Sequence, residues 1–424
     1  MASRWSLWAL PALFAATALA VFFRPYIFRA LRVGIHHALR NVAEAEIYNR
    51  TVIASNYFND GFVRRGLGGT IALLLSPEWN RSIWLFIALS IAALIVPLAL
   101  IMRQLAMRLS ITQTAYLGLV LAISPQSFLG WSSDPSRTDL FVGACLAIAV
   151  LAWLRQHRAI ALASILIGFL AHETALIYGL PLLAAFAIVD FRSGSLTHRQ
   201  VLRLAAAALI GVAVIIVLQM IWSAPPEVTA RNMLDQAPAL AGDAKHQLWR
   251  DIAIYMAVGG SRALATALCY NVQMSARYWP EFFGCIALLA VYALILPVRR
   301  HLSLAALVMW VPPIFMMLVA NDTGRWLKLG MLNGWLLASF LLLRGVADAQ
   351  LGPRALKLGA LLICGLLAMG PTRHNTINDA YSRLLDRLGY PEHTALDVWM
   401  DSCDPEWRRV VYGSSTGTSP VRAP

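Results

Sequence analysis

Charged residues are scarce in this sequence. Only 13% of its 424 residues are Asp, Glu, Lys or Arg, whereas 59% are hydrophobic, and the mean hydropathy is +0.63. This composition excludes a soluble globule of this length, which would need more charge on its surface. It predicts an all-α, polytopic membrane protein built as a helix bundle.

Cysteine is rare too, with five scattered copies. Cys145, Cys285 and Cys364 fall inside predicted spans, and neither a metal-ligand spacing nor a disulfide framework is evident. Cys269 and Cys403 fall on segments predicted to face outward, where the two could form a disulfide.

Several well-known motifs are missing from the sequence. It has no zinc signature, Ser-His-Asp order, Walker loop or dinucleotide fingerprint, which disfavours soluble nucleotide chemistry. No internal repeat is evident, which weakens any interpretation as a transporter built from inverted halves.

Eleven apolar segments are predicted to cross the membrane. They are residues 5–23, 82–102, 111–130, 139–154, 159–172, 174–190, 202–222, 282–298, 302–320, 326–343 and 355–371. Together they define a predicted transmembrane domain over residues 1–371. Gly66 to Ser76 is apolar but too short to cross, so we expect it to lie in the interface or to dip in and return.

The first apolar segment follows Arg4 and could be a cleaved signal peptide. We favour an uncleaved helix, because about 19 apolar residues are enough to span a bilayer. Either interpretation leaves the next segment outside.

The charges are divided unevenly between the two sides. Short loops rich in Lys and Arg are assigned to the cytoplasmic side. These loops contain only two acidic residues, Asp190 and Asp348, against thirteen basic ones: Arg4, Arg103, Arg108, Arg155, Arg158, Arg192, Arg199, Arg203, Arg299, Arg300, Arg344, Arg354 and Lys357. Almost every carboxylate is therefore predicted to lie outside, where any acid–base chemistry would take place.

This topology has a cytoplasmic N-terminus and, because the number of spans is odd, an outward-facing C-terminal tail over residues 372–424. The tail includes an amphipathic piece, Ile377 to Leu388, and ends in a run expected to be disordered. The net charge of +13 is explained by helix orientation and contact with anionic lipid heads, so nucleic acid is not implied.

Two long outer segments are predicted, residues 24–81 and 222–281. The first contains Phe28 to Tyr48, whose apolar residues recur every three or four positions beside basic ones, as in a helix lying on the membrane.

Ala159 to Asp190 is apolar and too long for one ordinary span, yet basic loops flank both of its ends. It is therefore predicted to form a hairpin with its turn at His172 and Glu173. Each arm has about 14 to 17 residues, or about 21 to 25 Å of helix, against a hydrocarbon thickness of about 30 Å. The turn should lie below the outer surface, in a protein-lined or wet recess.

Four outward-facing places hold candidate functional residues. Asp60, Arg64 and Arg65 precede a Gly-rich stretch that would suit a phosphate beside a proton acceptor, or else an ion pair with close helix packing. Arg137 and Asp139 lie at a second place, where a helix cap is a sufficient structural explanation.

The hairpin turn and a short later loop are the other two places. His172 and Glu173 are either functional or a buried hydrogen-bonded pair that closes the turn. Asp322 and Arg325 are spaced to form a salt bridge on one helical face, but Arg325 beside Trp326 would also suit phosphate recognition at a membrane surface.

This arrangement resembles the GT-C superfamily of integral membrane glycosyltransferases over residues 1–371. In that superfamily the first helix runs from inside to outside, a long outer loop with membrane-lying helices follows, and a loop carboxylate serves the reaction. Asp60 occupies the position of that carboxylate. Asn59 stands where the family often has a second acidic residue, so a divalent metal is left open and no cofactor is certain.

The resemblance implies a polyprenyl-phosphate-linked sugar as donor, with a glycan or lipid as acceptor, at the outer face of a bacterial-type inner (plasma) membrane. A lipid-linked donor needs a base for the acceptor and cations for the departing phosphate. Asp60 would be the general base. Arg64, Arg65 and Arg325 would hold the phosphate. His172 and Glu173 would shape the acceptor site or share proton transfer, with Arg137, Asp139 and Asp322 contributing to substrate binding.

Three other functions are compatible with the sequence. A polymerase or ligase of lipid-linked glycans would also place basic residues in outer loops, as here in Arg231, Lys245, Arg250, Arg262 and Arg277. A transporter or flippase would keep ionisable residues near the middle of the bilayer. A non-catalytic assembly subunit would use the same polar pairs to lock helices together.

Overall fold

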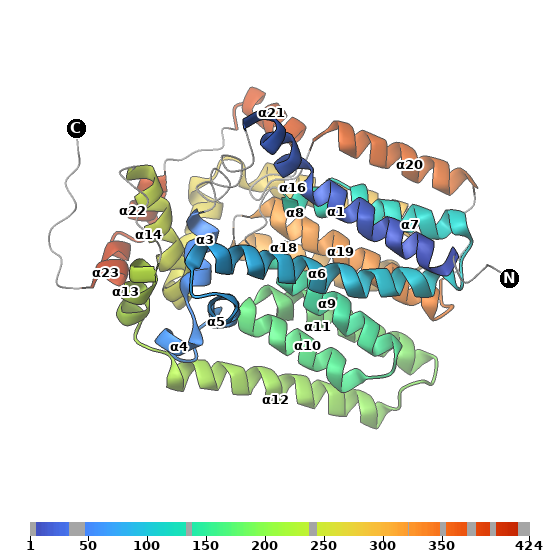
Figure 1. Ribbon diagram of the computed structural model, residues 1–424, viewed down its shortest axis with the longest axis horizontal. Coiled ribbons are helices and arrows are strands. Elements are labelled where there is room, and N and C mark those ends of the chain that lie inside the picture. Colours follow the sequence, from blue (N-terminus) through green and yellow to red (C-terminus); the bar gives the residue numbers. More distant parts are fainter. Residues whose placement is uncertain are drawn as a thin grey trace.

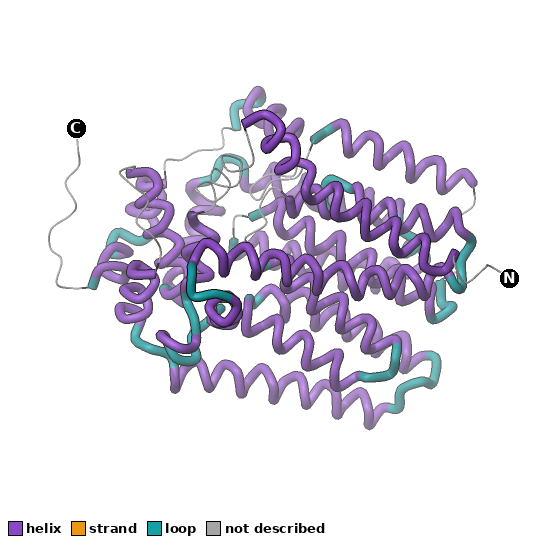
Figure 2. Tube along the Cα trace, in the orientation of Figure 1, coloured by secondary structure: helices purple, strands orange, loops and turns teal. Residues whose placement is uncertain are grey.

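The computed structural model describes residues 6–33, 47–132, 138–236, 244–320, 322–347, 353–370, 379–390 and 396–413. Throughout these ranges the secondary structure is helical and contains no strand, apart from an isolated bridge between Gly61 and Ser223 (Figure 2). The predicted all-α class is confirmed.

Within the described ranges, seven helices are long and apolar enough to cross a membrane. They are α1 (Ser6–Val33), α6 (Trp79–Ala106), α11 (Thr174–Arg192), α12 (His198–Trp222), α16 (Tyr278–Ile295), the composite helix Arg299–Val319 and α19 (Thr323–Leu343). The shorter apolar helices are α5 (Gly66–Leu75), α9 (Asp139–Leu154), α10 (Arg158–Ala171) and α20 (Pro353–Ala368). Figure 1 shows most of these helices lying along the long axis of the molecule, as expected for a membrane bundle.

Prolines explain where several boundaries depart from the sequence prediction. The segment predicted as one span over 111–130 divides into α7 (Ile111–Ile123) and α8 (Phe128–Ser132), because Pro125 disfavours helix at Ser124. The composite helix contains a π-helical turn, η3 (Ala306–Trp310), between α17 (Leu302–Ala305) and α18 (Val311–Val319). Pro312 and Pro313 lack the N–H groups that would continue regular α-helical bonding there.

The first helix is longer than predicted. It continues past Phe23 and through Pro25 to Val33, because Tyr26 to Phe28 extend its apolar sequence. The amphipathic helix predicted over Phe28 to Tyr48 thus begins as part of α1, and residues 34–46 lie outside the described ranges. The described part of the amphipathic piece predicted in the tail forms α21 (Asp379–Arg387).

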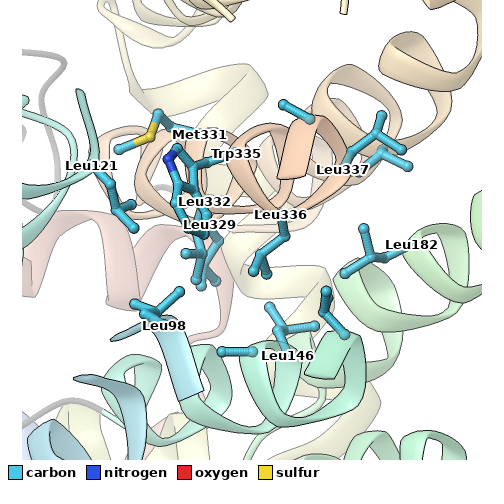
Figure 3. Close-up of a cluster of buried hydrophobic side chains, with 14 of the residues drawn as sticks. Leu98, Leu121, Leu146, Leu182, Leu329, Met331, Leu332, Trp335, Leu336 and Leu337 are labelled. Carbon is cyan, nitrogen blue, oxygen red and sulfur yellow. The ribbon is translucent and has the colours of Figure 1, made fainter. Parts of the chain in front are cut away.

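Helix α19 is the centre of the bundle. Its apolar window is 100% buried, whereas that of α12 is only 6% buried. Leu329, Leu332 and Leu336 point from α19 toward Leu98 of α6 and Leu146 of α9 (Figure 3). Helix α19 is thus enclosed by other helices, whereas the apolar surface of α12 is mostly exposed. Such exposed apolar surface is typical of a helix bundle in lipid.

A second buried cluster forms a helical cap at one end of the bundle (Figure 1). The cap comprises α3 (Ile47–Ala54), α13 (Pro226–Gln236), α14 (Ala244–Val258), α15 (Gly260–Cys269), α22 (Leu396–Cys403) and α23 (Trp407–Tyr412). It packs around Tyr255, Met400 and Trp407. A disulfide between Cys269 and Cys403 joins α15 to α22, so the pairing considered from the sequence is confirmed.

Candidate functional site

Four helices begin beside one another near the cap, and each brings a charged residue to its first turn or N-cap. Arg65 is the N-cap of α5, Asp139 is the first residue of α9, Glu173 is the N-cap of α11 and Asp322 is the N-cap of α19. The N-terminus of a helix carries partial positive charge and stabilises a nearby carboxylate. The three acidic residues are therefore placed where helix dipoles favour them.

Arg325 links three of these helix ends. Its Nε lies 2.6 Å from Asp139 Oδ2, one Nη lies 3.2 Å from Asp322 Oδ2, and the other Nη lies 2.9 Å from Nε2 of His172. Arg325 is only 7% exposed, so its charge is held inside the protein by two carboxylates. The planar fork of a guanidinium suits this three-way contact, because three separate nitrogens donate, whereas the three donors of an ammonium group all lie on one nitrogen.

The contact with Arg325 also bears on the charge state of His172. A guanidinium only donates, so His172 Nε2 accepts, and an imidazole that accepts at one nitrogen is neutral. Nδ1 lies 3.2 Å from the Thr174 N–H, which donates to it, 3.0 Å from the Thr174 hydroxyl and 3.6 Å from Glu173 Oε2.

Glu173 binds both arginines that precede α5. Arg65 Nε donates to Glu173 Oε2 at 3.0 Å, and Nη2 of both Arg64 and Arg65 contacts Oε1. The Arg64 side chain is 36% exposed and that of Glu173 25% exposed. The Arg65 side chain is 13% exposed and that of Asp322 23% exposed. Arg64 and Glu173 are therefore the most accessible members of a helix-end network in which Asp139, His172 and Arg325 are buried.

The helix-end network, defined as Arg64, Arg65, Asp139, His172, Glu173, Asp322 and Arg325, combines seven of the nine residues singled out from the sequence. With a neutral imidazole, its three guanidinium groups match its three carboxylates. An anion that binds Arg64 and Arg65 must therefore compete with Glu173 for them.

The backbone before α5 is held in an uncommon conformation. Arg65 has φ 63, in the left-handed region that few residues other than glycine adopt. A Cβ at Gly69 would lie 2.2 Å or less from the carbonyl oxygens of Ile53 and Ser55. The glycine-rich stretch therefore allows close packing of α5 against α3, as the structural alternative from the sequence expected. The Asp–Arg ion pair of that alternative is not formed by Asp60, because Arg64 and Arg65 pair with Glu173 instead.

Asp60 lies outside the helix-end network. It is the last residue of α4 (Tyr57–Asp60) and is fully buried. Its Oδ2 accepts from the Asn56 N–H at 2.9 Å, and its Oδ1 accepts from the Asn232 amide at 2.8 Å. Burial raises the pKa of Asp60 above its ordinary value, although the bonds from Asn232 and Asn56 oppose the rise.

Helix α4 nevertheless connects Asp60 to the neighbourhood of the network through Tyr57. Tyr57 donates to the carbonyl of Leu170, two residues before His172, and its ring stacks on Phe62 at 5.0 Å. On the other side, the Asp60 carbonyl accepts from Ala224 N–H at 2.8 Å, at the start of the second outer segment. Asp60 thus connects the cap to the bundle. It lies next to the network, but its hydrogen bonds are to Asn56, Asn232 and Ala224.

Sequence reasoning missed three polar residues. Asn232 had no local signal, because its partner Asp60 is 172 positions away. Asn56 caps α4 and could have been found as a helix-start residue. Lys328 is buried one turn after Arg325 and donates to the Gly130 carbonyl at 2.9 Å. An ionisable residue inside a predicted span is itself a signal.

Two predictions from the sequence, the role of Arg137 and the divalent metal, cannot be assigned to described residues. Arg137 lies outside the described residues. In the ranges that the structure describes, no three His, Cys, Asp or Glu side chains gather as a metal site, so no residues can be assigned to the divalent metal left open by the sequence.

No family model, curated protein or solved structure matches this chain. Its function must therefore be argued from the geometry of the site.

Proposed function

We propose that this chain is a membrane glycosyltransferase that moves a sugar from a polyprenyl-phosphate donor to a cell-envelope glycan or lipid acceptor at the outer face. The observation that supports this most is the pair Arg64 and Arg65, which both contact Glu173 beside converging helix N-termini. Arginine pairs and helix N-termini both favour phosphate.

The proposed topology has eleven passes with the N-terminus in the cytoplasm. The seven long helices would be joined by α7, α9, α10 and α20, which are shorter and would cross where the bilayer thins or where neighbours cover their ends. The cap would lie outside, because disulfides such as Cys269 to Cys403 form and persist in oxidising compartments. The inner membrane of a bacterial-type cell fits this arrangement.

The reaction needs no leaving-group acid. The acceptor oxygen would attack the anomeric carbon of the donor sugar, and the bond from that carbon to the phosphate oxygen would break. The phosphate would leave with the electron pair and gain negative charge, which Arg64 and Arg65 would stabilise. The acceptor proton would pass to a carboxylate.

Asp60 is the proposed proton acceptor. A carboxylate whose pKa is raised by burial takes up a proton more readily than an ordinary one. Its present hydrogen bonds to Asn56 and Asn232 mean that an acceptor hydroxyl would reach it only after α13 moves. Glu173 is the second candidate, since phosphate binding would release it from the arginines beside neutral His172.

Structural observations bear on the alternatives as well. Arg262 donates to Asp404 at 2.6 Å, and Arg277 donates to Asp386 at 2.9 Å and to the Tyr390 carbonyl at 2.8 Å. These arginines tie the second outer segment to the C-terminal segments, which favours a structural role over glycan binding by a ligase. A transporter is less favoured because Leu329, Leu332 and Leu336 fill the centre of the bundle beyond Lys328.

Incubation of the purified protein with radiolabelled polyprenyl-phosphate sugars and envelope lipids tests the proposal. We expect label to leave the donor in the presence of an acceptor, and Asp60→Asn to abolish transfer. Asp235→Asn, an exposed acid on the same cap helix as Asn232, is the matched control and should be fully active. Failure to release label from every donor tried, with lipid-linked glycans joined instead, would favour the ligase.

A further inference from the structure

Helix α12 lies at the edge of the bundle (Figure 1). Two cavities lie beside it. One, of about 330 Å³, is lined by apolar residues of α9, α10, α11 and α12. The other, of about 420 Å³, lies between α10 and α12. Leu162 and Leu204 line both, so the two cavities flank a single contact between α10 and α12.

The second cavity is polar at one end only. Arg158, Gln200 and Arg203 lie within the first turns of α10 and α12, whereas Leu166 and Ala207 line the part farther along both helices. From Arg158 to Leu166 the groove follows α10 for about 12 Å, at 1.5 Å per residue. Half of a bilayer's hydrocarbon is about 15 Å thick, so the groove has the depth of one leaflet.

The polar end of this groove is strongly basic. Arg155, Arg192 and Arg199 are exposed around it, in addition to Arg158 and Arg203. Asp190 is the described acid nearest in sequence, and it is fully buried, where it accepts from Trp153 and Arg344 at 3.0 Å. The groove therefore meets solvent or lipid with an excess of positive charge.

The positive charge of Arg158 is only partly neutralised by the described residues. Its closest contacts are neutral, with Gln156 Oε1 at 2.7 Å and the Ser195 carbonyl at 3.1 Å, whereas Asp190 Oδ2 is 3.8 Å away and is already bound by Arg344. Its Nε is buried without a hydrogen-bond partner. The side chain as a whole is 17% exposed, so a phosphate oxygen at the mouth of the groove would complement the guanidinium charge.

We infer that the groove holds an anionic phospholipid, with its phosphate against Arg158 and Arg203 and its acyl chains along Leu162, Leu166 and Leu204. Basic pockets between membrane helices bind anionic head groups, and the two cavities offer one place for each of two chains. The site is separate from the helix-end network, because the 14 residues of α10 place its two ends about 20 Å apart. It does not depend on the proposed enzymatic activity.

Native mass spectrometry of the full-length protein, purified with mixed phosphatidylglycerol and phosphatidylcholine, tests this inference. We expect phosphatidylglycerol to be retained in preference to phosphatidylcholine, and Arg203→Gln to lower its retention several-fold. Arg192→Gln is the matched control, because Arg192 is exposed near the same helix ends but lines neither cavity. Equal losses in the two variants would show a diffuse surface attraction and overturn the site.

A second variant tests the groove without changing charge. Ala207→Trp would fill the part of the cavity beyond Leu204. We expect it to lower phosphatidylglycerol retention, with a melting temperature close to that of the parent because Ala207 is exposed. Unchanged retention in this variant, or equal binding of the two lipids to the parent, would contradict the inference.

Discussion

Arg325 and His172 meet across 153 positions of sequence, with a guanidinium nitrogen 2.9 Å from His172 Nε2. The contact joins the first turn of α19 to the turn between α10 and α11. It makes the imidazole an acceptor at this nitrogen, and it holds Arg325 in the orientation that also reaches Asp139 and Asp322.

Replacement of Arg325 should show how much of the fold depends on this contact. Arg325→Ala leaves the buried Asp139 carboxylate without its partner, and we expect a loss of about 3–5 kcal/mol in the free energy of unfolding. Arg325→Lys loses the planar fork, because its three donors lie on one nitrogen, but it keeps the charge beside Asp139, so it should lose less stability. Chemical denaturation in detergent measures both. A lysine variant as unstable as the alanine variant would mean that geometry, and not charge, dominates.

Glu173→Gln should strengthen anion binding. The substitution removes the carboxylate that now occupies Arg64 and Arg65, so a phosphate would no longer compete with it. We expect polyprenyl phosphate to bind up to about tenfold more tightly, which corresponds to about 1.4 kcal/mol. Arg65→Gln should weaken binding instead. If neither variant changes the dissociation constant, the arginines serve only to close the helix ends.

The pH dependence of transfer should report on Asp60. Burial raises the pKa of this carboxyl, and a base acts only when deprotonated, so activity should fall as the pH drops through the raised value. Because the Asn232 hydrogen bond lowers this pKa, Asn232→Leu should move the acid limb of the kcat/KM profile to higher pH. An acid limb that does not move would assign the titration to another group.

The raised pKa of Asp60 also makes the stability of the folded protein depend on pH. A carboxyl with a raised folded pKa stabilises the protein below its unfolded pKa, and this contribution is lost as the pH rises through the folded value. Asp60→Asn cannot ionise, so it should remove this loss of stability at higher pH and flatten the dependence of melting temperature on pH, which thermal melting at several pH values would detect.

Removal of the disulfide should loosen the cap. It closes a sequence separation of 134 residues, and loss of a bridge of this kind typically costs about 2–4 kcal/mol. We expect Cys403→Ser to lower the melting temperature and to expose the cap to protease before the bundle. Cys364→Ser, which alters a free and exposed cysteine, is the control. A cap that resists protease equally with and without the bridge would assign its stability to packing around Tyr255 and Trp407.

Much of the architecture follows from the sequence because apolar length and charge in the loops are strong signals. The hairpin turn at His172 and Glu173 could be placed from the basic residues that flank both arms. The pairing of Cys269 with Cys403 could be considered because both fall on segments predicted to face outward, but it did not follow from the sequence. Helix ends near Pro125 and in the π-helical turn before Pro312 could not be placed as well, because apolar runs continue through them.

The candidate site could be predicted only in part. The charged residues at helix ends were identified individually, but which ends are neighbours depends on packing around α19. Asp60 shows most clearly what could not be predicted from the sequence. Its closeness in sequence to Arg64 suggested a shared site, whereas the fold turns its carboxylate toward Asn232, a residue with no local sequence signal.

The complete enclosure of α19 restricts how this protein can move. A helix packed on every side cannot tilt or slide without separating several neighbours at once. The cap is attached near the network through hydrogen bonds such as those from Asn232 and Ala224 to Asp60, which can break singly. Entry of a large ligand should therefore displace the peripheral helix α13 while the axis of the bundle keeps its place, and hydrogen exchange should be fastest at that rim.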